Sequence, residues 1–451
     1  MRKIISFCLS GFFVSLTIFI LFSYSGAVDR QANADYRARR EALAKKANGM
    51  VVLFAGIESE GPNDLYGFRQ DDNFYYLSGS GEPGSALLIA PAMEAKGNSP
   101  GHAYTEILFL PARNLIQEKW TGPKLGPENV DAPKITGFDH VKEMGELPAE
   151  VAKLTVGTRP VIFTDVAGHD ETSFSMEPLE FLKRTNSFLS FQDVKPFLSS
   201  LRTTKDAGEM VLLRKAVDAS VAAHFAAFHS VKPEIGEREI SSLMQYEWGK
   251  RGCERPAYAP IVGSGYYSTV LHYSDDDKTM KSGDVVVIDA AGEYSMYAAD
   301  ITRTLPIGGH FTAREREIYD IVLGAQQAAI DAFQSGKSSI TRGGGANSLY
   351  QVAYDYINTH GKDLHGQPLG QYFIHGLGHY IGLNVHDPGN YEVPLGPGMA
   401  FTIEPGIYIP EEKIGVRIED DFYVDADGKL IKLSGALPSK AEDVEKAMAG
   451  K

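Results

Sequence analysis

The sequence predicts an α/β N-terminal domain followed by an α+β C-terminal domain with an internal pseudo-twofold repeat. Three observations support this prediction. The chain has 451 residues, which is long for one domain; helix-like and strand-like patterns alternate up to about residue 200; and an acidic hairpin pattern then occurs twice. We therefore expect a first domain over residues 28–200 and a second over residues 201–451, preceded by a removable segment at residues 1–27.

The composition is that of a folded protein with an acidic surface. Hydrophobic residues make up 43% of the chain and charged residues 23%, so a large core can form. The formal net charge is −14, which argues against a surface that binds nucleic acid.

Residues 1–27 have the pattern of a secretory signal peptide. Arg2 and Lys3 precede a charge-free apolar run from Ile4 to Phe22, and small residues form a plausible cleavage site that ends at Ala27. An apolar helix of about 20 residues spans a bilayer, so an uncleaved anchor formed by residues 4–22 is the alternative and the only membrane contact that we expect. The protein is thus expected to be exported, either periplasmic or secreted.

The first half of the expected N-terminal domain combines a helix with short strands. The pattern of charged and apolar residues predicts a helix over residues 34–47. Runs rich in aliphatic and aromatic residues predict strands over residues 50–56, 74–79 and 85–91, and the aromatic residues of the second run are expected in the core. No pattern places Trp120.

The C-terminal half begins after a boundary near residues 197–205. A turn rich in glycine and a strand-like stretch follow within residues 261–273. Apolar spacing predicts helices over residues 206–226, 238–250, 313–334 and 345–360.

Residues 285–304, VVVIDAAGEYSMYAADITRT, predict a β-hairpin with one aspartate on each strand. β-Branched residues favour the strands, and the Gly-Glu-Tyr-Ser segment favours the reversal. If the turn is centred between Tyr294 and Ser295, Asp289 faces Asp300 with Cβ atoms about 5 Å apart. Two such charges require a shared proton or a cation between them. The alternative is a pair of surface aspartates on an exposed hairpin.

Residues 399–424 repeat this pattern with glutamates. Glu404 and Glu419 flank a Pro-Glu-Glu reversal with its midpoint near Glu411 and Glu412, so their side chains can also face each other. Each hairpin follows two helical stretches. This arrangement predicts an internal repeat with a site at the interface of its halves, although the halves share little residue identity.

A stretch rich in glycine and histidine, IHGLGHYIGLNVHDPG, lies between the hairpins and contains His375, His379 and His386. Its first two histidines have the spacing of the zinc-protease helix, but the glutamate of HExxH is missing and each glycine disfavours a helix by about 1 kcal/mol. We therefore expect extended or looping backbone, where glycines allow other groups to approach closely. The alternative is a set of hydrogen-bonded core histidines.

Four carboxylates and one imidazole form a hard, oxygen-rich ligand set, whose negative charge two divalent cations neutralise. These donors favour Mn²⁺, Mg²⁺ or Ca²⁺, and the histidine shifts the preference towards a transition ion such as Mn²⁺. Paired ions about 3.5–4 Å apart activate a bridging water and polarise a carbonyl.

Five segments together resemble the proline-peptidase branch of the pita-bread metallopeptidases, and aminopeptidase P in particular. In chain order they are HYSDDDK, DAAGEYSMYAADITRT, HGLGHYIGLNVHDPG, EPGIY and GVRIEDD. The similarity extends over residues 201–434, and the segments FRQDDNFYYLSG and RNLIQEKW resemble the N-terminal domain of that family. The resemblance implies a pita-bread fold for the C-terminal domain.

The resemblance also implies a dinuclear metal centre, most often with Mn²⁺, with Co, Fe and Zn as the other candidates. Asp300 and Glu419 match the carboxylates that bridge both ions. Asp289 matches a ligand of one ion, and His379 and Glu404 match ligands of the other. The family commonly has glycine two residues after the first metal aspartate, where this chain has alanine, which we expect to shift the hairpin slightly.

Further residues match positions around the substrate in that family. His272 and His386 resemble the histidines that steady the substrate carbonyl and the tetrahedral intermediate. His375 resembles a pocket histidine, and Arg417 a polar partner of the metal shell. Trp120 matches a tryptophan that reaches a neighbouring subunit's active site in oligomeric members, so the resemblance implies a homo-oligomer.

The expected reaction is hydrolysis of the bond between an N-terminal residue and a following proline. A metal-bridging hydroxide attacks the carbonyl, Glu404 accepts the proton, and one metal with His272 or His386 stabilises the oxyanion. An acyl-proline bond has no N–H, so its selection needs a shaped apolar pocket, for which Tyr258 and Tyr408 are candidate walls. The expected partners are peptides with proline at the second position.

Two other functions remain open. A dipeptidase that splits only Xaa-Pro dipeptides uses the same metal ligands, and the N-terminal segments alone favour the aminopeptidase. A metal-free pita-bread module that binds a peptide or protein is expected to have lost ligands, whereas all five are present here.

Overall fold

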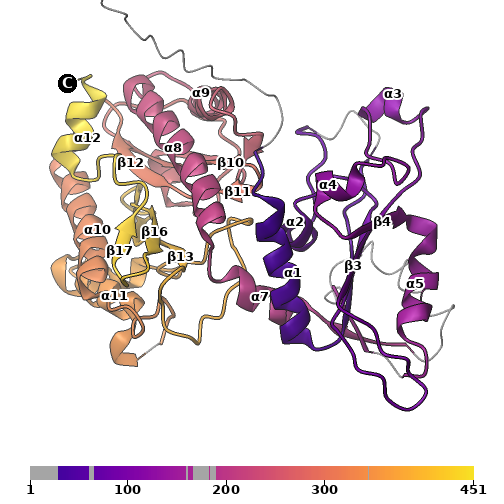
Figure 1. Cartoon of the computed structure of the whole chain (residues 1–451). Helices are drawn as coiled ribbons and strands as arrows, with labels where there is room; N and C mark the ends of the chain where they lie inside the picture. Colours follow the sequence, from indigo (N-terminus) through magenta and orange to yellow (C-terminus); the bar gives the residue numbers. More distant parts are fainter. Residues whose placement is uncertain are drawn as a thin grey trace, which may run out of the picture.

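The computed structural model describes residues 29–59, 65–158, 161–165, 182, 189–343 and 345–450. The expected signal peptide at residues 1–27 lies outside these residues, so its presence stays a prediction. Figure 1 shows two lobes, an N-terminal one in indigo and purple and a C-terminal one in pink through yellow. No helix of the described residues combines the length and the apolar character that crossing a membrane requires.

The N-terminal lobe is built on a mixed six-stranded sheet with the strand order β4-β3-β2-β1-β5-β6. The three central strands pair antiparallel, and the outer strands join them in parallel. Helices alternate with these strands along the chain, which confirms the α/β class. The strands are β1 (Met50–Phe54), β2 (Ala86–Ala90), β3 (Thr105–Leu110), β4 (His140–Glu143), β5 (Val161–Thr164) and β6 (Ser190–Asp193). The helices are α1 (Asn33–Ala47), α2 (Asp72–Ser78), α3 (Glu118–Thr121), α4 (Ala132–Thr136), α5 (Leu147–Leu154) and α7 (Lys195–Arg202).

The strand predicted over residues 74–79 is wrong, because this segment belongs to helix α2. The Asp71 side chain accepts a hydrogen bond from the Phe74 backbone N–H and caps the helix, and Gly79 ends it with a φ of 57°. These end signals outweigh the β propensity of the aromatic residues between them. The aromatic side chains are buried, which confirms their predicted place in the core.

The C-terminal lobe contains one unit twice, each consisting of two packed helices followed by antiparallel strands. Helices α8 and α9 share a buried cluster with the first set of strands, and α10 and α11 share a second cluster with the other set. This arrangement confirms the α+β class and the internal repeat. The helices are α8 (Ala207–Ser230), α9 (Glu237–Gly249), α10 (Ala313–Ala332), α11 (Leu349–His360) and the final α12 (Ala441–Met448).

The strands of the first repeat are β7 (Arg255–Pro256), β8 (Ile261–Ser264), β9 (Val285–Asp289), β10 (Gly292–Tyr294), β11 (Tyr297–Ala298) and β12 (Thr302–Pro306). Those of the second are β13 (Ala400–Ile403), β14 (Gly406–Ile409), β15 (Ile414–Arg417), β16 (Asp420–Val424) and β17 (Leu430–Lys432). The glycine-rich turn and the strand predicted within residues 261–273 both occur, but in the opposite order. Strand β8 comes first, and a 3₁₀ turn at Gly265–Thr269 follows it, where Gly265 adopts a φ of 55° and its carbonyl accepts the Ser268 hydroxyl.

The two lobes share one hydrophobic cluster. Leu43 of α1 and Val51 of β1 are buried together with Leu213 of α8 and Leu383. Arg39 of α1 also forms an ion pair with Asp206, the residue that caps α8. Packing across this interface therefore fixes the N-terminal lobe against the C-terminal one.

Candidate metal centre

The four carboxylates of the predicted site lie where the two hairpins meet. Asp289 ends β9, Asp300 lies between β11 and β12, Glu404 follows β13, and Glu419 precedes β16. An isolated β-bridge pairs Thr302 with Glu419 and so joins the first hairpin to the second. Each repeat thus contributes two acids to one place, as the sequence predicts.

The register predicted for the first hairpin is wrong. Asp289 pairs with Thr302, two residues beyond Asp300. The turn is centred on Ser295 and Met296, which adopt positive φ values of 50° and 72°. Because side chains alternate along a strand, a displacement of two residues still leaves Asp300 on the same face as Asp289.

The turn itself has unusual residues for its conformation. Positive φ at both central positions is typical of Asn-Gly turns, and here serine and methionine adopt it at some cost in strain. The Ser295 backbone N–H donates to the Glu254 carboxylate at 2.9 Å, and both turn residues are buried. Tertiary contacts therefore hold a turn that local sequence does not specify.

The second hairpin has the predicted register. Ile403 pairs with Asp420 and Gly406 pairs with Arg417, which places Glu404 opposite Glu419 between these two pairs.

Three of the expected ligands form the tightest group. Asp300, His379 and Glu419 each offer an atom within 4.8 Å of the others. His379 Nε2 lies 3.2 Å from Asp300 Oδ2 and 3.4 Å from Glu404 Oε1. The Thr302 hydroxyl donates to Glu419 Oε2 at 2.6 Å. One imidazole and three carboxylates therefore converge on a small volume.

Asp289 joins this group through two polar side chains. The Tyr258 hydroxyl lies 2.6 Å from both Asp289 Oδ1 and Asp300 Oδ1. Arg417 Nη2 donates to Asp289 Oδ2 at 2.6 Å, and its Nη1 donates to the Tyr408 hydroxyl at 2.7 Å. The two tyrosines that the sequence offers as pocket walls thus also hold the polar groups of the centre.

The donor set fits divalent cations. Glu419 Oε1 is buried and has no hydrogen-bond partner within the part of the chain that the structure describes. Such an oxygen is costly in a folded protein. Burial and the neighbouring carboxylates raise the pKa of both Asp300 and Glu419. Divalent cations would supply the missing partner and the missing positive charge in this set of oxygens and one imidazole.

The histidine stretch has extended and looping backbone, as predicted. His379 and Thr402 of β13 exchange hydrogen bonds, from the His379 N–H to the Thr402 hydroxyl and from the Thr402 N–H to the His379 carbonyl. A Cβ on Gly378 would lie 2.0 Å from the Thr402 carbonyl oxygen, so this close approach requires glycine. His379 Nδ1 lies 3.1 Å from the Tyr380 carbonyl, which leaves Nε2 facing the carboxylates.

A cavity of about 430 Å³ opens onto the carboxylates. The His386 ring packs edge-on against His379 with a centroid distance of 4.3 Å. His375 Nε2 lies 2.8 Å from the Tyr408 hydroxyl. The cavity gathers all the histidines assigned to the site with further predicted residues, and its lining includes Tyr258, His272, Asp289, Asp300, His375, His379, His386, Glu404, Arg417 and Glu419.

Two predicted residues are absent from this lining. Tyr408 is buried and contacts the lining residues His375 and Arg417 through its hydroxyl. The structure does not bring Trp120 to the cavity.

Trp120 lies on helix α3 of the N-terminal lobe, and its side chain is 79% exposed. Leu115 and Ile116 of the same segment are also exposed.

Two buried helix residues near the carboxylates are absent from the predicted site. His224 Nε2 of α8 lies 3.0 and 3.1 Å from the carbonyl oxygens of Ala290 and Ile301, the residues that follow the two aspartates. Gln326 Nε2 of α10 donates at 3.0 and 3.3 Å to the carbonyl oxygens that precede the two glutamates. In each repeat, therefore, one helix side chain binds backbone carbonyls of both strands beside the acids, and a polar residue on the buried face of a helix is the only sequence signal.

The alanine at position 291 fits the first hairpin. Ala291 is fully buried, and its carbonyl accepts the Ala257 N–H at 2.9 Å. The next position has a stronger requirement, since a Cβ on Gly292 would lie 2.8 Å from Cys253 Sγ and 2.9 Å from the Trp248 ring.

Metal binding is expected to strengthen as the pH rises. Burial raises the pKa of Glu404 to about 7. Burial lowers the pKa of His379, but the hydrogen bond to Asp300 and the charge of Glu404 outweigh it and raise that pKa to about 9. Both groups must lose a proton to bind a cation. Because the pKa values of Glu404 and His379 are raised in the folded state, their protonated forms stabilise the metal-free protein at low pH. This stabilisation is lost as the pH rises through about 7 for Glu404 and then through about 9 for His379.

The increase in Tm on adding Mn²⁺ should therefore be larger at about pH 8.5 than at about pH 6.5. Differential scanning fluorimetry of chelator-treated protein, with and without the cation at constant ionic strength, measures this difference. An increase that stays the same or shrinks with pH would contradict the prediction.

Known protein families match most of the chain. The model of metallopeptidase family M24 matches residues 211–426, and the model of the aminopeptidase P N-terminal domain matches residues 36–163. The Xaa-Pro aminopeptidase of Haemophilus influenzae is 32% identical over 440 residues, which are 91% of this chain and 96% of that protein.

Two solved structures also share the fold. Proline aminopeptidase P II from Yersinia pestis aligns with a TM-score of 0.79 and 30% identity, and covers 93% of this chain and 100% of its own. Zinc-substituted aminopeptidase P from Escherichia coli in complex with product aligns with a TM-score of 0.80 and 28% identity, over 94% of this chain and 99% of its own.

Proposed function

Because the chain belongs to metallopeptidase family M24 and carries an aminopeptidase P N-terminal domain, we propose that it releases the N-terminal residue from peptides with proline at the second position. The protein is a metal-dependent aminopeptidase with a mixed α/β N-terminal lobe and a pita-bread catalytic lobe. The observation that carries the proposal is the convergence of four carboxylates and His379 at one cavity lined by further histidines.

We propose that Asp289, Asp300, His379, Glu404 and Glu419 hold two divalent cations. Asp300 and Glu419, which lie with His379 in the group whose atoms are within 4.8 Å of one another, would be the carboxylates shared by both ions, as the resemblance implies. Mn²⁺ is the proposed native metal because hard oxygen donors with one imidazole favour it, and Co, Fe and Zn are the other candidates. Metal analysis of the purified protein tests this assignment.

The bound cations would make a water molecule nucleophilic at neutral pH and polarise the scissile carbonyl. Glu404 is the proposed acceptor of the proton of the attacking water, because its carboxylate lines the cavity beside His379. Burial and the proximity of His379 lower the pKa of His386, so its ring is neutral and donates one N–H towards the developing oxyanion. His272 lines the same cavity and is the second candidate donor.

A peptide panel tests the proposed function. Tripeptides of the form Xaa-Pro-Xaa should be cleaved after the first residue. Replacing their proline by alanine should lower kcat/KM by about 10- to 200-fold, because the fit of an apolar group to a shaped pocket contributes about 1–3 kcal/mol. Chelation should abolish turnover, and Mn²⁺ should restore it.

Xaa-Pro dipeptides are the control in this panel. Cleavage of dipeptides alone would identify the protein as a dipeptidase and would contradict the proposed aminopeptidase. Turnover that survives complete metal removal would contradict the metal-dependent reaction itself.

We also propose that the protein forms a homo-oligomer through the exposed segment around Trp120. Leu115, Ile116 and Trp120 lie within six residues of one another and are between 65% and 79% exposed, and clusters of exposed apolar side chains mark interaction sites. Light scattering of the native protein and of the Trp120→Ala variant measures the oligomer size. A monomeric native protein would contradict the proposal.

The proposed location is outside the cytoplasm, either periplasmic or secreted, after cleavage behind Ala27. The basic start and the apolar run of residues 4–22 support it. N-terminal sequencing of the exported protein distinguishes cleavage from a retained membrane anchor.

A further inference from the structure

The loop at residues 382–387, which carries His386, is held by side chains of both lobes. Within the described residues, the His386 ring makes only a ring contact with His379 and no hydrogen bond. Its imidazole therefore has no polar partner of its own to fix it. The position of the ring over the cavity depends on the backbone that carries it.

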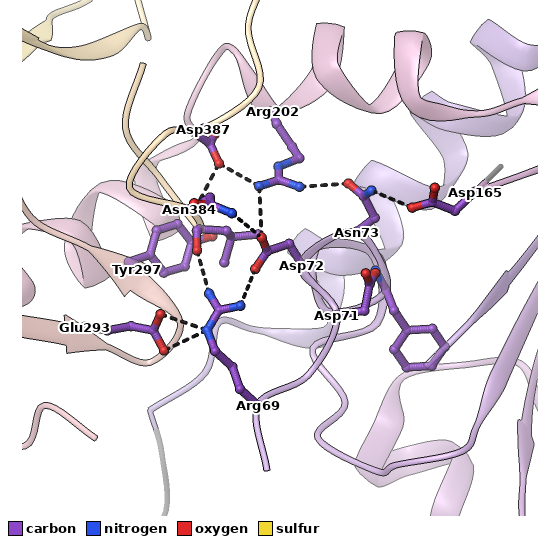
Figure 2. Close-up of polar contacts among 12 residues, drawn as sticks. Arg69, Asp71, Asp72, Asn73, Asp165, Arg202, Glu293, Tyr297, Asn384 and Asp387 are labelled. Carbon is purple, nitrogen blue, oxygen red and sulfur yellow. Dashed lines mark hydrogen bonds and ion pairs between the residues drawn. The ribbon is translucent and has the colours of Figure 1, made fainter. Parts of the chain in front are cut away.

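Arg69 of the N-terminal lobe fixes one side of this loop. Its Nη2 donates to the Leu383 carbonyl oxygen at 2.7 Å. Its Nη1 donates to Asp72 at 2.8 Å, and its Nε donates to Glu293 of strand β10 at 2.8 Å. One guanidinium thus joins helix α2, the first hairpin and the loop, as Figure 2 shows.

Asp72 adds a second contact from the same lobe. Its Oδ2 accepts a hydrogen bond from the Asn384 side-chain amide at 3.1 Å. Residues from outside the catalytic lobe therefore hold two consecutive positions of the loop, Leu383 and Asn384, directly before the pair that lines the cavity.

Asp387 fixes the other side of the loop. It is buried, and its oxygens accept hydrogen bonds from Arg202 at 2.6 Å and from Lys205 at 2.9 Å. Asp387 Oδ1 also accepts the Asn384 backbone N–H at 3.1 Å, which closes the loop on itself. Arg202 in turn donates to Asn73 of α2, so contacts on both sides of the loop connect it to the first residues of that helix (Figure 2).

We propose that Arg69 and Asp72 are positioning residues for His386, so that the N-terminal lobe completes the catalytic site. This inference rests on the proposed function for the role of His386, and it adds that the lobe sets where the imidazole lies relative to the substrate carbonyl. A guanidinium with three separate acceptors is a rigid fork, whereas a single contact would leave the loop free to shift. A displacement of about 1 Å at a catalytic group lowers a rate by up to about 10²-fold.

The first test measures local opening of the loop and does not depend on enzymatic activity. Amide hydrogen exchange across residues 382–387 should be at least about tenfold faster in the Arg69→Met variant than in the native protein, because the loop loses its hold on the Leu383 carbonyl. Methionine keeps the unbranched apolar part of the side chain and removes all three donor nitrogens.

The matched control is Arg39→Met. Arg39, like Arg69, is an arginine of the N-terminal lobe that forms an ion pair with the C-terminal lobe, but its partners are Asp206 and other residues outside the loop. In the Arg39→Met variant, the rate of amide hydrogen exchange at residues 382–387 should stay within about twofold of the native value. Unchanged exchange in Arg69→Met, or an equal increase in both variants, would overturn the proposal.

The second test is a double-mutant cycle between Arg69→Met and His386→Ala. Arg69→Met should lower kcat/KM about tenfold when His386 is present and by less than about twofold when it is absent, because the two residues act as one unit. Metal content should be the same in all four proteins. An undiminished effect of Arg69→Met in the His386→Ala background would overturn the positioning role.

The two tests separate this proposal from the proposed function. A native protein that cleaves no Xaa-Pro peptide would contradict the function, and the exchange experiment would still decide whether the N-terminal lobe holds the loop. If the native protein is active and the amide exchange of the loop is the same in Arg69→Met, only the positioning role would be contradicted.

Discussion

Replacing Asp300 with alanine is expected to abolish cation binding and peptidase activity together. Asp300 lies in the group whose ligand atoms fall within 4.8 Å, and it contacts both His379 and Tyr258. Without its carboxylate, the remaining donors cannot surround two cations. Turnover should fall by more than about 10²-fold, the usual cost of removing one electrostatic group from a catalytic centre. Peptide assays and metal analysis of the same preparation measure both effects.

The Asp300→Asn variant shows whether the loss reflects the site or the fold. The amide keeps the shape of the side chain and removes one of several buried like charges, so the metal-free protein should be at least as stable as the native one. Asp331→Ala, at an exposed position on α10, is the control and should leave activity unchanged. Full turnover of Asp300→Ala would contradict the assignment of this residue to the metal centre.

Replacing Arg303 with methionine is expected to lower the free energy of unfolding by about 3–5 kcal/mol, the range for breaking a buried ion pair. Arg303 and Asp420 are fully buried and joined at 2.7 Å. Arg303 Nη1 also donates to the carbonyl oxygens of Thr302 and Glu419, the residues that bridge the two hairpins. The change therefore leaves a buried charge and two backbone carbonyls with fewer partners.

Denaturant unfolding of the metal-free protein measures this loss, since bound cations would add their own stabilisation. Arg316→Met is the control. Arg316 forms exposed ion pairs with Asp320 and Glu442, and removing them should change stability by at most about 1 kcal/mol. A loss below that value for Arg303→Met would show that the buried pair does not hold the hairpins together.

The sequence identifies the acids of the site because the alternation of side chains along a strand is robust. The register of the first hairpin is displaced, yet Asp289 and Asp300 still share a face because the displacement is an even number of residues. A displacement by one residue would have separated them. The second hairpin, with a Pro-Glu-Glu reversal, has the expected register.

The residues that support the site leave almost no local signal. His224 and Gln326 bind backbone carbonyls far away in the chain, so neither the spacing nor the type of their neighbours reveals them. The turn at Ser295 and Met296 depends on Glu254, which precedes it by many residues. Such contacts arise from tertiary packing and lie beyond what propensity can predict.

The segment FRQDDNFYYLSG shows the same limit. Its resemblance places it in the N-terminal domain, and Phe74, Tyr75 and Tyr76 are in the core as expected. Its aromatic run predicts a strand, whereas the Asp71 cap makes it a helix. The contact of Arg69 with the Leu383 carbonyl joins positions too distant in the chain for any local pattern to connect.

The bridge between Thr302 and Glu419 has a consequence for the order of events during folding. The proposed ligands come from segments far apart in the chain, and this bridge joins the two repeats that carry them. Contacts between such distant segments form late, because closing long loops is entropically unfavourable. We therefore expect bound cations to slow the unfolding of the native protein and to leave its folding rate nearly unchanged, because early folding species lack the complete site.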